Sequence, residues 1–597
     1  MKKIIGLAIF LLYFINAYSS TSIYTATVSG HWTHTGSPYL IYNDINISYD
    51  SSLIIDPGVD VIFQGAYYFT VYGILSATGT LAQPIRFHKQ DTTGWADTTT
   101  GIGGWKGFQF ASWSPYLGTD NSTFKYCNVY DTKDQLFTTY RPMIISNCNF
   151  YHNKSGAISV MVDSAMQTDI NHCSFYNNYG QIIICLASDV SACGVIHFRN
   201  NLVYDNIPNI SAIHCGYATL LVDSNEIYQN RQTDTTNGGA LEMYNCKAVI
   251  SCNKVHDNIT LSDGAVSIWQ TVADINGNYI CNNQAYINTA LGSCGHVQGG
   301  GGVRVDDEGS TLPSTSSVTI RNNIIANNST NYNGGGIYAV IANVDIHNNT
   351  IVNNVSNEGG IYLSTIAGYN IKVSNNILLN NVSNMLYIGT PDSMNIHFGE
   401  LDTIVYHHNW TQHSFTSDFH NDNFTITVPY VAADTLTNII SSSPGLVAPT
   451  LMADPTESAM TADFRLLSTS ACINKGDNTG IIGWEPDFAG NKRIFGGIID
   501  IGAYEYGSGI NAIVPVSLQK LSTLSVYPNP ASNLIFITLS EAKGTINLND
   551  ITGKQVAQQN VNQTLTSIDI HELPKGIYFA VWNDGENIKG VHKIVVQ

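Results

Sequence analysis

The middle of the chain repeats one six-residue pattern, seen in Asn225-Glu-Ile-Tyr-Gln-Asn230, Asn253-Lys-Val-His-Asp-Asn258 and Asn278-Tyr-Ile-Cys-Asn-Asn283. The ten copies begin at Cys127, Cys148, Cys173, Asn201, Asn225, Asn253, Asn278, Asn323, Asn349 and Asn376. Successive copies begin 21 to 28 residues apart, except for one interval of 45 that holds an insertion around 285–318. Self-similarity at such a period is typical of solenoid proteins.

Two columns of apolar residues repeat with the same period as this pattern. One stands two positions after each start, as at Ile227 and Val255, and the other three positions before it, as at Val222 and Ile250. Short apolar strands of this kind cannot bury their apolar face alone, whereas stacked coils bury one continuous core. The sequence therefore predicts coils whose parallel strands lie ~4.8 Å apart.

Asn suits a corner between two such strands for two physical reasons. It tolerates left-handed backbone geometry, and its side-chain amide can bond the amide of the same residue one coil away. We therefore expect Asn253, Asn278 and Asn349 to line up along one axis. In three early copies, Cys takes the same inward position as an apolar substitute.

Glycines mark a second corner, because each group of them precedes a short strand. The groups are Gly238-Gly239-Ala240, Asp263-Gly264-Ala265, Gly300-Gly301-Gly302, Gly334-Gly335-Gly336 and Gly359-Gly360. This Asn and Gly pattern resembles the right-handed parallel β-helix superfamily, which includes pectate-lyase-like proteins. The resemblance implies an all-β solenoid, which we assign to residues 20–450.

The segment after the repeats carries a different set of motifs. It contains Asp463-Phe-Arg-Leu466, Asp487-Phe-Ala-Gly-Asn-Lys-Arg493 and Asp500-Ile-Gly-Ala-Tyr-Glu-Tyr506. These resemble the choice-of-anchor Q segment that ends many bacterial surface β-helix proteins. We expect residues 451–506 to cap the open end of the solenoid core.

The last part of the chain, residues 521–597, follows a linker at 507–520. Short alternating strands at ~10-residue spacing predict a small Ig-like β-sandwich. Val526-Tyr-Pro-Asn-Pro530 and Lys575-Gly-Ile-Tyr578 resemble the type A sorting domain of the type IX secretion system. That resemblance implies export by the type IX secretion machinery of a Bacteroidota-type bacterium, whereas a generic Ig-like module is the alternative.

The N-terminus has the features of a secretory signal. Lys2 and Lys3 precede an apolar run over residues 4–15, and small residues follow at Ala17 and Ser19. Such a run is too short to span a bilayer, so we assign residues 1–19 as a signal peptide. We expect a secreted or outer-membrane surface protein, attached to the surface rather than transmembrane, and a monomer.

Composition excludes one class of partner. The 597 residues include 26 Lys and Arg against 45 Asp and Glu, a net charge of −19, and nucleic-acid binders need a basic surface instead. Eleven cysteines without a CxxC motif argue against a zinc or redox site. The close pairs Cys185/Cys193, Cys246/Cys252 and Cys281/Cys294 leave disulfides and free buried thiols both open.

Alternation after each Gly corner predicts which side chains leave the core. We expect apolar residues such as Ile213, Leu241 and Val266 to point inward. The first outward row is Ser159, Ile183, His214, Glu242, Ser267, Arg304, Tyr338 and Tyr362. The second row, two positions further along, is Met161, Cys185, Gly216, Tyr244, Trp269, Asp306, Val340 and Ser364.

These rows place acid–base chemistry beside aromatic rings. His214 and Glu242 on adjacent coils are candidate catalytic acid or base residues, with Arg304 to neutralise charge. The candidate substrate-binding residues are Tyr244, Trp269, Tyr338, Tyr362 and Asp306, because rings stack on sugars while polar groups bind hydroxyls. A solvated sheet face with mixed residues is the alternative interpretation.

Two further groups raise the question of a metal. The run Asp306, Asp307 and Glu308 offers oxygen ligands for a possible Ca²⁺, or is simply a solvated loop. The segment 385–450 contains His397, His407, His408, His413 and His420, but it lacks fixed ligand spacing. An irregular loop or terminal coil is therefore the favoured interpretation of that segment.

The β-helix enzymes that the fold resembles have signatures that are missing here. Of the polygalacturonase set only Asp306-Asp307 is present, and the Trp-Ile-Asp-His signature of pectate lyases is absent. Residues 121–384 hold 11 Lys and Arg against 18 Asp and Glu, a balance of 11 − 18 = −7, so neutral glycans fit better than polyanions. The sequence favours a protein that binds glycan or another surface ligand. The alternatives are a polysaccharide lyase or glycoside hydrolase, and a structural adhesin.

Overall fold

A computed structural model gives the three-dimensional structure of the chain. The described residues are 20–97, 102–110, 122–134, 137–139, 141–156, 158–161, 167–186, 195–233, 238–286, 299–307, 317–357, 359–364, 369–383, 396–398, 404–412, 419–421, 437–450, 458–481, 485–508, 524–527, 531, 533–539, 542–550, 554–563, 565–571, 573–583 and 588–596. The predicted signal peptide and most of the predicted linker lie outside them. The chain divides into two compact units, residues 1–512 and 513–597.

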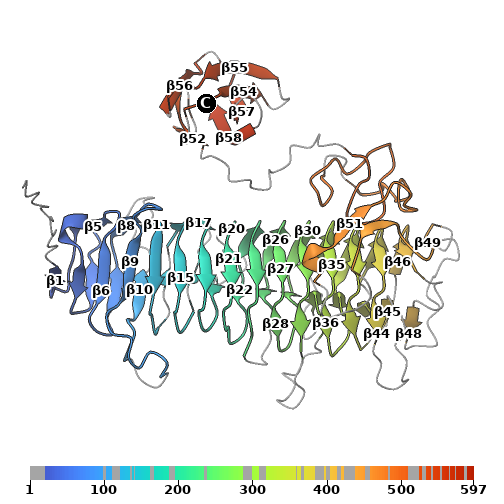
Figure 1. The fold of residues 1–597 in the computed structure, drawn as a ribbon, viewed down its shortest axis with the longest axis horizontal. Helices are drawn as coiled ribbons and strands as arrows, with labels where there is room; N and C mark the ends of the chain where they lie inside the picture. Colours follow the sequence, from blue (N-terminus) through green and yellow to red (C-terminus); the bar gives the residue numbers. More distant parts are fainter. Residues whose placement is uncertain are drawn as a thin grey trace, which may run out of the picture. The chain divides into compact units, whose positions relative to one another are not determined.

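The larger unit is built from three long parallel sheets, named A, B and C here (Figure 1). Sheet A contains β1 (Thr21–Ile23), β3 (Tyr39–Ile41), β6 (Asp60–Phe63), β9 (Ile85–Lys89), β12 (Cys127–Tyr130), β15 (Asn149–Tyr151), β18 (Ser174–Tyr176), β21 (Leu202–Tyr204), β24 (Glu226–Tyr228), β27 (Lys254–His256), β31 (Tyr279–Cys281), β35 (Ile324–Ala326), β39 (Thr350–Val352), β43 (Ile377–Leu379), β47 (Trp410–Thr411) and β49 (Ile439–Ile440). Sheet B contains β4 (Ile45–Ile47), β7 (Tyr68–Val71), β10 (Gly107–Phe110), β13 (Phe137–Thr139), β16 (Ile158–Met161), β19 (Ile183–Leu186), β22 (Ile213–Gly216), β25 (Leu241–Tyr244), β29 (Val266–Trp269), β33 (Val303–Asp306), β37 (Ile337–Val340), β41 (Ile361–Ser364), β45 (Ile396–Phe398) and β48 (Phe419–Asn421).

Sheet C completes each coil between sheets B and A. It contains β2 (Gly30–Trp32), β5 (Ser52–Ile55), β8 (Ile74–Thr78), β11 (Ser122–Lys125), β14 (Met143–Ser146), β17 (Gln167–Asn171), β20 (Val195–Arg199), β23 (Thr219–Asp223), β26 (Lys247–Ser251), β30 (Val272–Asn276), β34 (Ser317–Arg321), β38 (Asn343–His347), β42 (Ile371–Ser374) and β46 (Ile404–His407). A short fourth sheet contains β28 (Ile259–Thr260), β32 (Gln284–Ala285), β36 (Ser329–Thr330), β40 (Val355–Ser356) and β44 (Val382–Ser383). A 3₁₀ turn, η1, spans His34–Gly36.

Each strand pairs in parallel with the strand at the same position of the next coil. In the coil formed by β25, β26 and β27, for example, Leu241 pairs with Val266, Ile250 with Ile275 and Val255 with Ile280. These inward residues have no exposed surface and belong to one core that runs from Val28 to Tyr406. The predicted parallel β-helix is thereby confirmed.

The Asn residues form two ladders inside the solenoid, as predicted. The ladder at the first position of the repeat joins Asn201, Asn225, Asn253, Asn278, Asn323, Asn349, Asn376 and Asn409 through side-chain bonds of 2.9–3.1 Å. A second ladder joins the last residues of the repeats, from Asn153 to Asn381. One detail differs from expectation, because the left-handed residue is the one before the ladder Asn, such as Cys252 with φ 55°.

The early cysteines stand in the first ladder as the sequence predicts. The backbone N–H of Cys173 donates to Asn201 Oδ1 at 2.9 Å, and Cys127 N donates to Cys148 Sγ at 3.4 Å. All three carry free, buried thiols, and Cys246 and Cys252 are free as well, so that pair does not close a loop. Cys193, Cys294 and the Cys185 side chain lie outside the described part of the chain.

Residues 458–508, called the lateral segment below, contradict the expectation of an end cap. Phe464, Cys472 and Ile501 pack with Ile324 and Ile377 on the outer face of sheet A, in a cluster separate from the solenoid core. The segment begins with the 3₁₀ turn η5 (Ala459–Thr461), and β51 (Asp463–Leu466) pairs with β50 (Leu446–Ala448). It covers the outer face because the outward residues of these coils are apolar. Figure 1 shows it along the flank of the later coils.

The smaller unit is an antiparallel β-sandwich. One sheet contains β52 (Leu524–Tyr527), β53 (Leu534–Leu539) and β56 (Leu565–Asp569), and the other β55 (Gln555–Asn560), β54 (Thr545–Asp550), β57 (Gly576–Asn583) and β58 (Ile588–Val596). Both sheets contribute to one core, which includes Ile537, Leu548 and Trp582. Across the described residues of both units, no helix is both long and apolar enough to cross a membrane.

The ladder yields a direct stability test. Asn278 Oδ1 accepts from the backbone N–H and side-chain amide of Asn253, and its Nδ2 donates to Ile250 O at 2.7 Å. In Asn278→Ala these buried partners lose their bonds, so we expect a loss of at least ~3 kcal/mol in the free energy of unfolding. Urea denaturation followed by circular dichroism measures it.

A matched control lies on the outer face of sheet A. There Asn149 Nδ2 donates to Asn128 Oδ1 at 2.8 Å in a partly buried position. Because water can replace this bond, Asn128→Ala should cost no more than ~1 kcal/mol. Equal losses in the two variants would contradict a special role for the buried ladder.

Candidate functional site

The first outward row of sheet B has the predicted register through its central strands. His214 pairs with Glu242, Glu242 with Ser267 and Ser267 with Arg304. The row continues from Arg304 to Tyr338 and Tyr362.

On the earlier strand β19, the residue in this row lies one position later in the sequence than predicted. Ile184, not Ile183, pairs with both Ser159 and His214. In the second row Leu186 takes the position predicted for Cys185.

The residues of this row differ in solvent exposure, although the sequence predicted that all of them face solvent. Glu242 is 4%, Arg304 2% and Tyr338 1% exposed, so these side chains are covered. The His214 side chain remains 21% exposed, and Tyr362 is partly exposed. The expectation that the whole row meets solvent is therefore wrong.

Glu242 is held by its neighbours on the preceding coil. Its Oε2 accepts from the Ser211 hydroxyl at 2.7 Å and lies 2.9 Å from His214 Nδ1. Burial raises the pKa of the Glu242 carboxyl, but the bonds to His214 and Ser211 and the charge of Arg304 outweigh burial and hold the pKa below its usual value. Glu242 is therefore an anion at neutral pH, and it orients the imidazole of His214.

Arg304 lies between two carboxylates. Its guanidinium donates to Asp306, and its Nε lies 3.4 Å from Asp263 Oδ1. Asp263 in turn accepts from the backbone N–H of Gly238 at 2.9 Å and from the Ser267 hydroxyl at 3.3 Å. Burial lowers the pKa of Arg304, but the charges of Asp263 and Asp306 outweigh this, so the pKa lies above its usual value.

The predicted calcium site conflicts with these contacts. The Asp306 carboxylate bonds to Arg304, and Asp307 Oδ1 accepts from the backbone N–H of Gln270 at 2.8 Å. Both aspartates are buried, so the solvated-loop alternative is wrong for them as well. A cation beside Arg304 would meet its positive charge, which disfavours Ca²⁺ here. Glu308 lies outside the described residues.

Aromatic rings gather where the strands of sheet B end. Tyr244 lies edge-to-face with Trp269 at a centroid distance of 5.2 Å and with Tyr217 at 5.4 Å. All three are partly exposed, whereas Tyr338 is buried and stacks on Tyr362 at 5.2 Å. Tyr338 is thus unsuited to the predicted contact with a ligand. Sequence reasoning missed Tyr217 because it stands in the corner, outside the alternation of the strand.

A second aromatic feature on sheet A was also missed. Rings stack along the outer face of seven strands, with centroids 4.6–5.2 Å apart: His88, Tyr130, Tyr151, Tyr176, Tyr204, Tyr228 and His256. The signal was available, since the fourth position of the repeat is Tyr in its first five copies. Because these rings cover one another's faces, the stack strengthens the sheet and leaves only ring edges to solvent.

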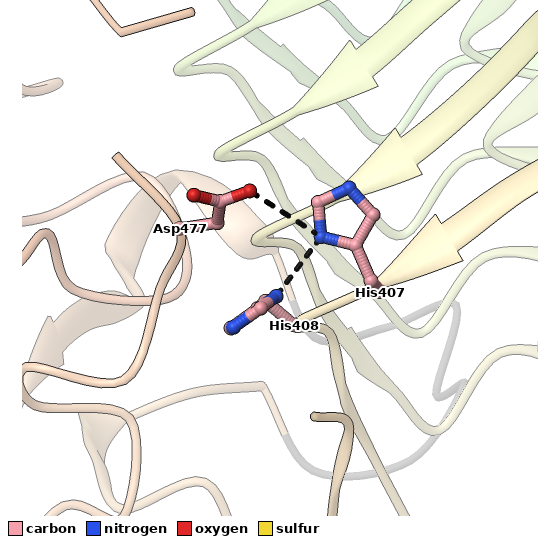
Figure 2. A group of neighbouring side chains, drawn as sticks. All are labelled: His407, His408 and Asp477. Atoms are coloured by element: carbon pink, nitrogen blue, oxygen red, sulfur yellow. Dashed lines mark hydrogen bonds and ion pairs between the residues drawn. The ribbon is translucent and has the colours of Figure 1, made fainter. Parts of the chain in front are cut away.

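The His-containing segment holds the last candidate group. His407 and His408 lie beside Asp477 of the lateral segment, and their potential ligand atoms are all within 4.8 Å of one another (Figure 2). The three residues are partly exposed. The sequence favoured an irregular loop or terminal coil because these histidines lack fixed ligand spacing, and the carboxylate comes from 70 residues further along. The side chains of His397, His413 and His420 lie outside the described residues.

Comparison with known proteins identifies the smaller unit. Residues 525–597 match the family described as a secretion system C-terminal sorting domain, which bears out the predicted type IX resemblance. The chain is therefore exported to the cell surface or outer membrane. No curated protein matches the chain in sequence.

Three solved structures with some likeness to the chain have low sequence identity to it. They include pectate lyase Pel9A (14% identity, TM-score 0.26, 75% of this chain and 88% of that one) and the periplasmic alginate epimerase AlgG (10%, 0.25, 62% and 76%). A PL6 family alginate lyase, AlyGC, has 14% identity and a TM-score of 0.26 over 65% of this chain and 54% of its own. The fold assignment rests on the strand pairing described above.

The ionised Glu242 predicts a pH-dependent contribution to stability. Since its pKa is lower in the folded chain than in the unfolded one, its stabilisation is present above ~pH 4.3 and disappears as the pH falls through the folded value. We expect Glu242→Gln to lose ~1–3 kcal/mol at pH 7, with the difference from wild type narrowing below ~pH 4. Urea denaturation over a pH series measures it.

Glu226→Gln is the matched control, because Glu226 faces His256 at 3.3 Å in a far more exposed position. Solvent weakens this pair, so the control should lose less than ~1 kcal/mol. A Glu242→Gln loss that does not change with pH would argue against an ionised Glu242.

Proposed function

We propose that the exported β-helix binds a neutral glycan at the edge of sheet B formed by Tyr217, Tyr244 and Trp269. The observation that carries the proposal is the edge-to-face packing of these rings, with interplanar angles of 87° and 72°. In each such contact only one ring has a face covered by the other. Partly exposed ring faces of this kind suit the C–H faces of sugars.

The polar residues beside these rings support an uncharged ligand. The guanidinium of Arg304 contacts the carboxylates of Asp263 and Asp306, and the charge of Glu242 acts on it as well. Arg304 is held by two of those acids and is buried, so its charge is already balanced within the chain. A polyanionic glycan would meet a surplus of negative charge here.

The same contacts favour binding over catalysis. A general acid or base must come within hydrogen-bond reach of the proton that it transfers. Glu242 and Arg304 are buried, which leaves His214 as the accessible titratable member of the His214–Glu242 pair. A polysaccharide lyase or glycoside hydrolase remains the second candidate, with His214 as acid or base and Glu242 orienting it. A structural adhesin is the third candidate.

Binding at the aromatic edge is testable by substitution. We expect Trp269→Ala and Tyr244→Ala each to weaken glycan binding by about tenfold, or ~1.4 kcal/mol, because each removes a ring face from the contact. A glycan array followed by calorimetry on the best ligand measures this in the full secreted chain. Tyr204→Ala, which removes a stacked ring from sheet A, is the matched control and should bind the glycan normally.

The three candidate functions give different outcomes in that experiment. Binding that survives both substitutions would contradict the proposed edge and favour the adhesin. Glycan products that form with wild type and vanish in His214→Ala would establish the enzyme instead. Loss of binding in all variants, the Tyr204→Ala control included, would indicate a folding defect and not a binding site.

Export through the sorting domain gives an independent prediction. Deletion of residues 525–597 should reduce the chain at the cell surface at least tenfold, with the remainder retained inside the outer membrane, because the sorting domain is what the machinery recognises. Protease treatment of intact cells measures surface exposure. A reporter protein that carries residues 525–597 and a signal peptide is the positive control, and unchanged display of the truncated chain would refute the prediction.

A further inference from the structure

We propose that His407, His408 and Asp477 bind one divalent transition-metal ion, with zinc as the expected metal. The ion would join the last coils of the β-helix to the lateral segment. The proposal does not depend on glycan binding, because this site belongs to the corner between sheets C and A and not to sheet B. Figure 2 shows the two imidazoles and the carboxylate directed toward one another.

The corner of the coil brings two consecutive histidines together. His407 is the last residue of β46, and His408 precedes the ladder residue Asn409. Along a regular strand, neighbouring side chains point to opposite faces. His408 has a left-handed φ of 52°, which breaks that alternation, and the two Nδ1 atoms lie 2.9 Å apart.

Asp477 is positioned by its own contacts with the β-helix. Its backbone N–H donates to Asn375 Oδ1 at 2.8 Å, and its carbonyl accepts from Asn375 Nδ2 at 2.9 Å. The backbone N–H of Thr479 donates to Asp477 Oδ1 at 2.9 Å. The other carboxylate oxygen, Oδ2, faces His407 Nδ1 at 3.8 Å.

The donor set and its spacing suit a tetrahedral ion. Metal–ligand distances of ~2.0–2.1 Å place tetrahedral ligand atoms ~3.3–3.4 Å apart. The two spacings at His407 Nδ1, 2.9 Å and 3.8 Å, lie on either side of that value, and all three ligand atoms lie within 4.8 Å of one another. Side-chain rotations would bring them to tetrahedral spacing around an ion. Two imidazoles and one carboxylate favour zinc or a similar ion over Ca²⁺ and Mg²⁺, which take oxygen ligands. A water molecule would complete the coordination.

Metal binding would strengthen a contact between parts of the chain far apart in sequence. The histidines belong to the β-helix and the aspartate to the lateral segment, 70 residues later. An ion that binds only when both are in place stabilises the docked arrangement by mass action. The lateral segment should therefore open less often when the ion is bound.

Metal titration of the full secreted chain, stripped with a chelator, tests the site. We expect wild type to bind one more equivalent of Co²⁺ than the His407→Ala/His408→Ala double variant, with the visible d–d bands of tetrahedral Co²⁺, and Zn²⁺ to displace it. Asp477→Asn should weaken binding at least tenfold. His31→Ala is the matched control, because His31 and Asp56 form a pair at 2.6 Å that is not part of the cluster and should leave the stoichiometry unchanged.

Limited proteolysis gives a second readout. At ten times the wild-type Kd, Zn²⁺ should slow cleavage within residues 458–508 of wild type by about tenfold, and it should slow cleavage of Asp477→Asn by no more than about twofold. Ca²⁺ in place of Zn²⁺ should give no protection. If the double variant misfolds, Asp477→Asn alone decides the question. Equal Co²⁺ affinity in wild type and Asp477→Asn, or Zn²⁺ protection of Asp477→Asn as strong as that of wild type, would overturn the proposal.

Discussion

The buried amide ladder is the constraint on which the rest of the structure depends. A ladder Asn such as Asn253 is almost fully buried, and it bonds both the next ladder residue and a backbone carbonyl of the preceding coil. A coil that slipped by one residue would leave these polar groups unpaired in the core, which is costly. The ladders therefore fix the register of the coils through which they pass, and with it the row to which each outward side chain of those coils belongs.

A fixed register brings residues that are far apart in the sequence into contact at the same strand position. Glu242 meets His214 of the preceding coil because both stand at the same strand position, 28 residues apart. Burial then requires each charge to have a partner, and Arg304 has two: Asp263 on the preceding coil and Asp306 in its own strand, β33. The result is a rigid network in which His214 remains partly exposed, next to aromatic rings whose faces are not mutually covered.

The sequence predicted the features that one coil repeats and missed those that depend on other segments. The Asn columns, and the position of Arg304 in the same outward row as Glu242 two coils away, follow from period and alternation alone. The Ile183 error arose where Ile182, Ile183 and Ile184 stand in a row, because such a run offers no alternation to set the register. The approach of Asp477 to His407 could not be predicted, since a contact with a segment 70 residues away has no periodic signal in the sequence. The burial of Tyr338 was also missed, because alternation predicts only that a side chain points outward and not whether it is covered.

The outer face of sheet A explains why the lateral segment lies along the β-helix and not over its end. In the earlier coils this face carries the stacked rings up to His256, and the five tyrosines among them are partly exposed. From Ile324 onward the outward residues are Ile, Ala, Val and Leu together with Thr350, whose hydroxyl accepts from the backbone N–H of Ala503 in the lateral segment. Docking of Phe464 and Ile501 removes this apolar surface from water. The ion pair of Arg321 with Glu485 at 2.9 Å helps to orient the lateral segment on the sheet. The proposed metal ligands would then hold the segment at the last coils, where fewer strands remain to support it.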